Sequence, residues 1–189
     1  MKKYYIVIVF LIVSNIFSQN KKYDTILFND IKLNEHQLFF KYESIRALEK
    51  CFGKLIKKEN SSEYENEIPL TRKKYQTNKF SNNEVSLLIT KDSVFVYYLN
   101  FEVSKKEIVL KYKGKKIILS EKFKLSQFKS LFPDSYQNAS GLPVVSFDQA
   151  AGVSLIIKNK NIKAYMNFAF YDGILSSVVF SKKILTIRD

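Results

Sequence analysis

The stretch Val85-Ser86-Leu87-Leu88-Ile89 returns 68 residues later as Val153-Ser154-Leu155-Ile156-Ile157, with four of the five positions identical. At the same spacing Tyr97 corresponds to Tyr165, so the match continues into the following strand. Self-similarity at a fixed spacing indicates an internal tandem repeat. The alternative is that two β-rich strings resemble each other by chance.

Earlier segments of the two halves also correspond. Ile31 matches Leu110 at a spacing of 79, and Ile45 matches Leu125 at a spacing of 80. The first half is therefore 12 residues longer between its helix and its later strands. The extra length falls in the polar stretch 57–83, where an insertion into a surface connection is tolerated.

Each half is expected to form a hairpin, a short helix and a run of strands. Breaks at residues 34–36 and at Lys113-Gly114-Lys115 predict the hairpin turns, because glycine adopts the positive φ that a tight turn requires. Apolar residues three and seven positions apart predict two helices, centred on Leu48 and Phe128, that end at Gly53 and Pro133. Alternation with period two predicts strands at 85–89, 94–98, 153–157, 162–170 and 178–180.

These elements predict the α+β class, with an antiparallel sheet or sheets and two short helices packed on one face, present as an internal tandem repeat. Residues 19–189 are expected to form a single α+β domain of two pseudo-repeats, at about 30–104 and 105–183, because no Pro/Gly/Ser-rich linker separates them. A strand at 108–110 is expected to join the halves in one continuous or closely packed sheet. A chain of this length buries roughly 70% of its unfolded surface, enough for a core without disulfides.

The first residues have the order of a secretory signal peptide. Lys2 and Lys3 precede an apolar run at residues 4–13, and more polar residues follow at 14–19. The run is too short to span a bilayer, and Ile16 and Ser18 in the minus-three and minus-one positions predict cleavage after Ser18. The alternative is an uncleaved N-terminal anchor. We expect residues 1–18 to be removed and the mature protein to be exported, either to the periplasm or as a secreted protein, with no membrane-spanning segment left.

The composition excludes several kinds of site. One cysteine cannot close an internal disulfide, and one cysteine with one histidine cannot build a multi-thiolate or poly-histidine metal site. The five glycines lie too far apart for a phosphate-binding loop or a dinucleotide turn. We therefore expect neither a metal nor a cofactor.

The chain is strongly basic. It has 31 lysines and arginines against 18 acidic residues, a formal net charge of +13, and loss of Lys2 and Lys3 with the signal leaves +11. Of the 31 basic residues 28 are lysine, which lacks the planar fork that reads phosphates and base edges, and the lysines are scattered as pairs. Nucleic acid is therefore not an expected partner, while an anionic envelope polymer remains an alternative.

Few residues are candidates for catalysis. Cys51 lies in the first predicted helix and matches Leu131 in the second, so we expect it to be a buried packing residue. A reactive thiol would need a base such as His36 beside it, and nothing in the spacing brings the two together. Asp134 and Asp148 flank a loop without evidence of an acid–base pair, and Asp134 is expected in a turn. We expect no catalytic residue and no enzyme activity.

The strand that begins at Val94 is apolar on both faces. If one face packs on the helix, the opposite face exposes aromatic side chains, and such a patch is typical of a partner site. In the second repeat, tyrosines keep part of this aromatic character. The candidate binding residues are Phe95, Tyr97, Leu99, Phe101, Tyr165 and Tyr171. The alternative is that the polar stretch 57–83, or the other half, covers this face.

The signal segment followed by two hairpin–helix–strand units, over about residues 30–183, resembles an uncharacterised family of small exported bacterial proteins, a domain of unknown function. The doubled helix-on-sheet plan is also similar to that of β-lactamase-inhibitor-protein-like domains, and this resemblance implies a sheet face that holds protein partners. The shared features are patterns of apolar residues, so no functional residue follows from either resemblance.

We therefore expect an exported, non-enzymatic binding protein of the bacterial cell envelope or secreted fraction, whose sheet face engages another envelope or secreted protein. Two alternatives remain open. One is a basic protein that binds anionic envelope polymers, and the other is an enzyme with a cryptic site.

The signal assignment predicts that expression in a bacterial host yields a mature chain beginning at Gln19. Removal of 18 of the 189 residues leaves 171. Intact-mass spectrometry of the exported protein measures this directly, and recovery of an exported chain that still begins at Met1 would contradict it.

Overall fold

A computed structural model describes residues 21–34, 36–58, 68–71, 77–141 and 150–185. The expected signal peptide, Asp148 and much of the polar stretch 57–83 lie outside the described residues. The helices are η1 (Phe28–Asp30), α2 (Ile45–Phe52), α3 (Leu125–Leu131) and α4 (Pro133–Tyr136). The strands are β1 (Thr25–Leu27), β2 (Ile31–Leu33), β3 (His36–Gln37), β4 (Phe39–Lys41), β5 (Ile56–Lys58), β6 (Asn78–Ser81), β7 (Val85–Ile89), β8 (Ser93–Asn100), β9 (Ile108–Tyr112), β10 (Lys115–Leu119), β11 (Ser140–Gly141), β12 (Ala150–Asn159), β13 (Ile162–Tyr171) and β14 (Ile174–Ser181).

The larger sheet, sheet A, has the strand order β1-β12-β13-β14-β8-β7-β6-β5, with β11 added on β12 and β4 on β8. The α+β class and the antiparallel pairing of consecutive strands are confirmed, and two-residue turns at Lys160–Asn161 and Asp172–Gly173 join β12 to β13 and β13 to β14. Sheet A is nevertheless mixed, because β1 pairs with β12 in parallel. β1 and β12 are more than 100 residues apart in the sequence, with Thr25 paired to Ile156. Local turn patterns therefore do not predict this parallel pairing.

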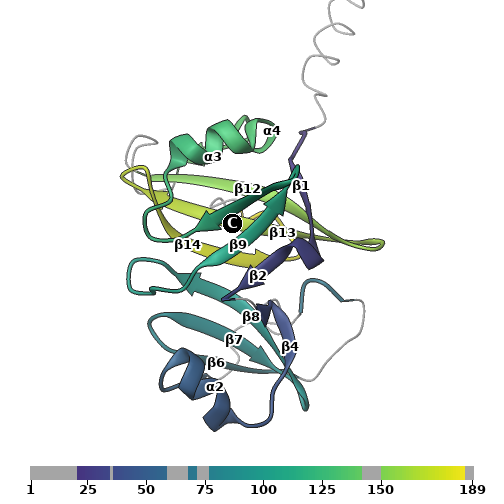
Figure 1. The fold of residues 1–189 in the computed structure, drawn as a ribbon, viewed down its shortest axis with the longest axis vertical. Coiled ribbons are helices and arrows are strands. Elements are labelled where there is room, and N and C mark those ends of the chain that lie inside the picture. The colour runs from purple at the N-terminus through teal and green to yellow at the C-terminus, as the bar shows by residue number, and fades with distance from the viewer. Residues whose placement is uncertain (1–20, 35, 59–67, 72–76, 142–149, 186–189) are drawn as a thin grey trace, which may run out of the picture.

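A smaller sheet, sheet B, has the order β10-β9-β2-β3 (Figure 1). The hairpin of β9 and β10 forms as expected, with Lys113 and Gly114 both at positive φ in its two-residue turn. The first expected hairpin divides between the sheets. β3 pairs with β2 over two residues, after which the Leu38 carbonyl accepts a hydrogen bond from Val96 N at 2.9 Å and β4 joins β8. The strand at 108–110 therefore belongs to sheet B and does not continue the sheet of β8.

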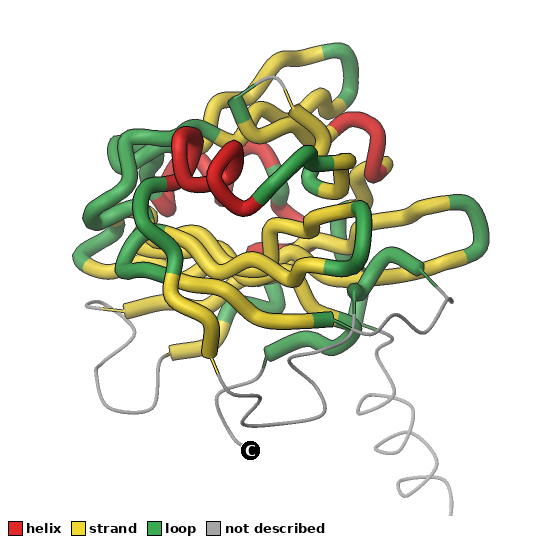
Figure 2. Tube along the Cα trace, turned by 90° about the horizontal axis from the view of Figure 1, so that it is seen from below, coloured by secondary structure: helices red, strands yellow, loops and turns green. Residues whose placement is uncertain are grey.

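The two sheets and the helices share one hydrophobic core. Along β13 the buried side chains Met166, Phe168 and Phe170 alternate with more polar ones, and Phe128 of α3 packs on two of them with ring centroids 5.1 and 5.9 Å apart. Figure 2 shows the helices, in red, above the set of long strands, in yellow, that crosses the lower half of the view. One face of β12–β14 is thus the floor of the core.

The two predicted helices are confirmed at their expected ends. α2 begins after Ser44, whose side chain accepts a hydrogen bond from Ala47 N, and it ends at Gly53 with φ of +77°. α3 ends before Pro133, but this proline then opens α4, where a turn at Asp134 was expected. Proline fits the first position of a helix because its missing N–H needs no partner there. Figure 1 places α3 and α4 at one end of the molecule and α2 at the other. Among the described residues, none of the helices has the length and apolar character needed to cross a membrane.

The N-terminal segment is tied to the second half through the buried side chain of Asp24. Its carboxylate accepts hydrogen bonds from Tyr112 Oη at 2.6 Å and from Ser135 N at 2.9 Å, and Asp24 N donates back to Ser135 Oγ. Ser135 is fully buried, so its N–H has no access to water as a substitute. One carboxylate therefore connects the start of β1 to sheet B and α4.

Replacing Asp24 by alanine is expected to lower the free energy of unfolding by about 1–3 kcal/mol, because it leaves the buried Ser135 N–H without an acceptor. Asp134→Ala is the matched control. It removes the ion pair between Lys22 Nζ and Asp134 Oδ2 at 3.2 Å, in which the lysine side chain is 79% exposed, and is expected to cost less than about 1 kcal/mol. Urea denaturation of both variants measures the difference, and equal losses would contradict this role of Asp24.

Candidate functional site

Sheet A has a second face, which points away from the core of α3 and which we call the outer face. The strand registers align Tyr98, Val179, Asn167 and Ser154 in one row across β8, β14, β13 and β12. The next row is Asn100, Ser177, Ala169 and Gly152. Paired residues of antiparallel strands project to the same side, so these small, polar and aromatic side chains share one surface.

A cavity of about 350 Å³ lies on this face, and we call it the outer-face cavity. Its floor includes Gly152, Ala169 and Ser177, whose small side chains leave the space, and its rim includes Tyr23 and Leu185. The volume falls in the range of about 300–1,000 Å³ typical of small-ligand sites. The cavity therefore offers room for one inserted group.

Asn167 is the buried polar centre of the outer face. Its Oδ1 accepts hydrogen bonds from Ser154 Oγ at 2.7 Å and from Leu185 N at 3.2 Å, and its Nδ2 donates to Ser181 Oγ at 2.9 Å. Ser181 Oγ in turn donates to the Lys183 carbonyl. These bonds hold the chain after β14 against the sheet and fix the shape of the cavity wall. The amide is a structural group here because its bonding capacity is used within the chain.

Two tyrosines give the outer face a neutral polar character. Burial raises the pKa of Tyr23 above its ordinary value, and the nearby Tyr165 raises it further. Burial also raises the pKa of Tyr98, partly offset by a hydrogen bond from Ser177. Both phenols are therefore uncharged near neutral pH and act as hydrogen-bonding groups with apolar rings.

Three of the sequence-predicted binding residues are not on any surface. Phe95, Leu99 and Phe101 are buried. The prediction that they form an exposed patch is therefore wrong, and the alternative, that this face of the strand is covered, holds at these three positions. At Phe95 the physical reason is Phe180, which packs edge-on against its ring at 6.1 Å, while β4 pairs alongside β8 and places Phe39 next to Phe95.

The other three predicted residues lie apart from one another. Tyr97 is half-buried on β8 with Lys79 Nζ 5.6 Å from its ring centroid, and Tyr165 is half-buried on β13 with Lys163 Nζ at 5.2 Å. Tyr171 is half exposed at the far end of β13, where it lines a different, more open hollow. Tyr165 adjoins the outer-face cavity through Tyr23, whereas Tyr171 does not.

Cys51 and His36 come together at a second cavity, of about 450 Å³, which we call the α2 cavity. The expected burial of Cys51 is wrong, because the thiol is exposed on α2 and lines this cavity together with His36. No hydrogen bond joins the two side chains in the part of the chain that the structure describes. Asp134 lies in α4 and pairs with Lys22, and Asp148 is outside the described residues. Within the described ranges, no three His, Cys, Asp or Glu residues gather as a metal site would require.

Comparisons with protein-family models, with curated proteins and with solved structures find no match to this chain. The resemblances to an uncharacterised exported family and to β-lactamase-inhibitor-protein-like domains therefore stay predictions.

Sequence reasoning missed the residues that form the outer-face cavity, above all Ser154, Asn167 and Ser177. A signal was available in β13, where the alternate positions 165, 167 and 169 are tyrosine, asparagine and alanine while those between them are large and apolar. Small or polar residues on one face of an otherwise buried strand mark a surface that the core does not use. The alignment of this strand with its neighbours required the structure.

The raised pKa values of Tyr23, Tyr98 and Tyr112 predict a loss of stability at high pH. Below the ordinary tyrosine pKa both folded and unfolded chains keep the proton; above it the unfolded chain ionises first, so the free energy of unfolding falls as pH rises through about 10. Urea denaturation between pH 8 and 11, compared with Tyr98→Phe, measures the effect. The variant is expected to lose less stability per pH unit, and an identical decline would contradict the prediction.

Proposed function

We propose that this protein is an exported, non-enzymatic binding protein of the bacterial envelope or secreted fraction, and that it receives a side chain of a protein partner in the outer-face cavity. The observation that carries the proposal is the meeting of two rows of small and polar residues over a cavity of about 350 Å³. The expected signal peptide supports export.

The chemistry of the face supports a protein partner. Tyr23 and Tyr98 offer apolar rings with neutral hydroxyls, and tyrosine is enriched at protein interfaces because it provides contact area at low entropic cost. Asn167 and its neighbours fix the wall, so little ordering is needed on binding. The hydroxyl of Ser154 bonds an amide and that of Ser181 a carbonyl, which supports a binding role over catalysis.

Charge supplies an alternative, a basic protein that binds anionic envelope polymers. The formal net charge is +13, but several lysines lie over aromatic rings on separate elements, among them Lys79, Lys113 and Lys129. A dispersed arrangement favours a solvated surface over one polymer-binding patch. Sensitivity to salt separates the two functions, because screening weakens exposed charge pairs far more than a packed contact.

We also infer that the two halves are copies related by a local twofold axis. Two antiparallel pairings join the halves, and both include residues 79 apart that face each other: Ile31 with Leu110, and Leu99 with Val178. A twofold axis through an antiparallel pair would relate each residue to its partner in this way. Asn34 and Lys113, also 79 apart, both have positive φ.

The bulges of sheet A support the same spacing. Tyr97 is the extra residue of β8 where its register with β7 shifts, and Ser176 is the extra residue of β14 where its register with β13 shifts. These two residues are also 79 positions apart. With a spacing of 79 residues, β8 corresponds to β14. The spacing of 68 residues between 85–89 and 153–157 would instead match β8 to β13. The outer face then combines equivalent strands from both halves.

Filling the outer-face cavity with Ala169→Phe is expected to weaken capture of a native partner at least tenfold. The mature chain is immobilised and exposed to the envelope and secreted fractions of its host, and captured proteins are identified by mass spectrometry at low and high salt. Capture that persists at high salt and is lost in the variant supports the proposal.

Tyr171→Ser is the matched control, because this residue lies on the same strand and the same face but outside the cavity. It is expected to capture the partner like the parent chain. Undiminished capture by Ala169→Phe, with an unchanged circular dichroism spectrum, would overturn the site, and capture that disappears with salt in all three chains would favour the polyanion alternative.

A further inference from the structure

We propose that the α2 cavity is a second, independent binding site that takes a small, uncharged and largely apolar molecule, such as an aromatic ring or a short acyl chain. The cavity has a volume of about 450 Å³ and lies between α2, the end of the β2–β3 hairpin and the connection from β4 to α2. Its apolar lining includes Leu33, Phe40, Leu48 and Phe52. The volume and the mainly apolar lining are those of a small-molecule site.

The cavity exists because side chains around α2 are smaller than those around α3. Phe128 of α3 fills the corresponding space, with its ring 5.0 Å from Phe132 and 5.1 Å from Phe168. At the matching position α2 carries Leu48, and one turn further it has Cys51 where α3 has Leu131. A leucine in place of a phenylalanine and a cysteine in place of a leucine both remove volume from a packed contact.

The residues just before the two helices also differ in how much of the space beside the helix they fill. Phe123, two residues before α3, is buried and packs on Phe170 with ring centroids 6.3 Å apart. Glu43, two residues before α2, is exposed and lines the rim of the α2 cavity. The first half therefore leaves open a space that the second half fills with its own aromatic side chains.

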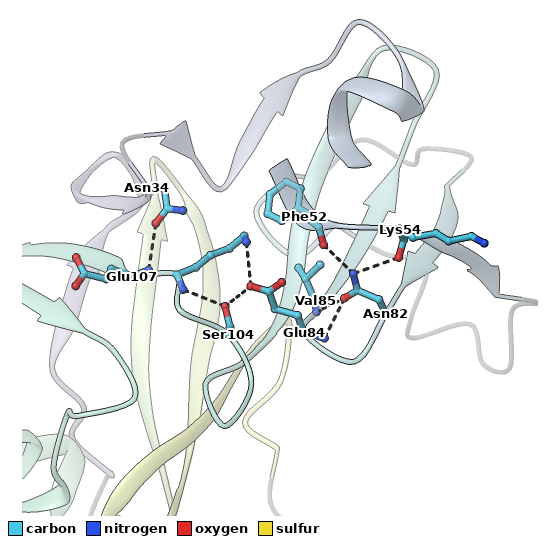
Figure 3. A network of polar contacts seen from close by, with 9 residues as sticks. Asn34, Phe52, Lys54, Asn82, Glu84, Val85, Ser104 and Glu107 are labelled. Carbon is cyan, nitrogen blue, oxygen red and sulfur yellow. Dashed lines mark hydrogen bonds and ion pairs between the residues drawn. The ribbon is translucent and has the colours of Figure 1, made fainter. Parts of the chain in front are cut away.

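A polar network fixes the wall of the cavity beside Phe52 (Figure 3). Asn82 Nδ2 donates to the Phe52 carbonyl at 2.7 Å, and Asn82 Oδ1 accepts from Glu84 N and Val85 N, both at 2.9 Å. The end of α2 is thereby held to the start of β7. A wall in which α2 is held to β7 by hydrogen bonds does not need to close on a ligand, which lowers the cost of binding.

The same network neutralises the charge within the cavity. Lys106, which lines it, places Nζ 2.9 Å from Glu84 Oε1 and 5.5 Å from the centroid of the Phe52 ring, and its side chain is 16% exposed. The remaining charged side chains of the lining, Lys41 and Glu43, are exposed and of opposite sign. Because these charges offset one another, the interior favours an uncharged ligand over an ion.

Aromatic and sulfur groups complete the lining. The rings of His36 and Phe40 lie 5.7 Å apart in a tilted arrangement, and the exposed thiol of Cys51 adds a polarisable atom. Such groups make favourable contacts with aromatic rings and with methylene chains.

N-Phenyl-1-naphthylamine, an uncharged aromatic molecule whose fluorescence rises in apolar surroundings, is the probe. Titration into the full mature chain is expected to give saturable binding at one site. Leu48→Phe, which places in α2 the residue that fills the space beneath α3, is expected to weaken binding at least tenfold. Cys51→Leu, at an exposed position where folding is not at risk, is expected to weaken it in the same direction.

Cys51 provides a second readout because it is the only cysteine of the chain. Its alkylation by iodoacetamide, followed by intact mass, is expected to slow in the presence of saturating probe. Ala169→Phe, which fills the outer-face cavity, is expected to leave both probe affinity and protection unchanged, so this site and the proposed partner site are tested separately.

Binding of the probe that is unaffected by both Leu48→Phe and Cys51→Leu, or alkylation of Cys51 that is not slowed by saturating probe, would overturn the proposal. Absence of saturable binding to the parent chain would overturn it as well. Loss of probe binding in Ala169→Phe alone would assign the probe to the outer face and refute the α2 site.

Discussion

The pairing of β8 with β14 is the contact on which the rest of this structure depends. Three residue pairs, Asn100 with Ser177, Leu99 with Val178 and Tyr98 with Val179, join strands from the two halves of the chain. Leu99 and Val178 are fully buried, so this short pairing also connects the parts of the hydrophobic core that the two halves contribute. Without it the rows of the outer face would end at β14, and the aromatic group of Tyr98 would not lie beside Val179 and Ser177 of that strand. Both the continuous sheet and its proposed binding surface follow from these pairs.

Much of the local structure could be predicted from the sequence. The alternation in β12 and β13, the turn at Lys113 and Gly114 and the ends of α2 and α3 depend on residues close together in the chain, where patterning and turn chemistry act directly. The contacts of strands far apart in sequence could not be predicted in the same way. The parallel pairing of β1 with β12 and the pairing of β4 with β8 are both contacts of this kind.

The candidate site shows the same division. Phe95 belongs to a strand that is apolar on both faces, so the strand alone does not show which face is covered, and Phe95 is buried with Phe180 packed against its ring. Cys51 has the pattern of a packing residue, yet it is exposed because the side chains around it do not fill the space beside α2. The ring that packs on Phe95 comes from the other half of the chain, whereas the space beside Cys51 is lined mainly by residues 33–52. Small residues leave the space in both cavities, and although β13 alone carries a signal of the outer face, the residues around each cavity come from several elements.

The hydrogen bonds of Asp24 with Tyr112 and Ser135 join segments that are far apart in the chain, and this affects the order in which the protein folds. The carboxylate is 111 residues away from Ser135, and β1 finds its partner strand only at Thr25 with Ile156. In the proposed export, with the N-terminal side crossing the membrane first, β1 would emerge long before Ser135 and Ile156. Contacts of such long range form late, since closing the loop between them costs entropy that only the nearly complete fold repays. On this proposal the segment that forms β1 would stay unpaired until residue 156 had also crossed.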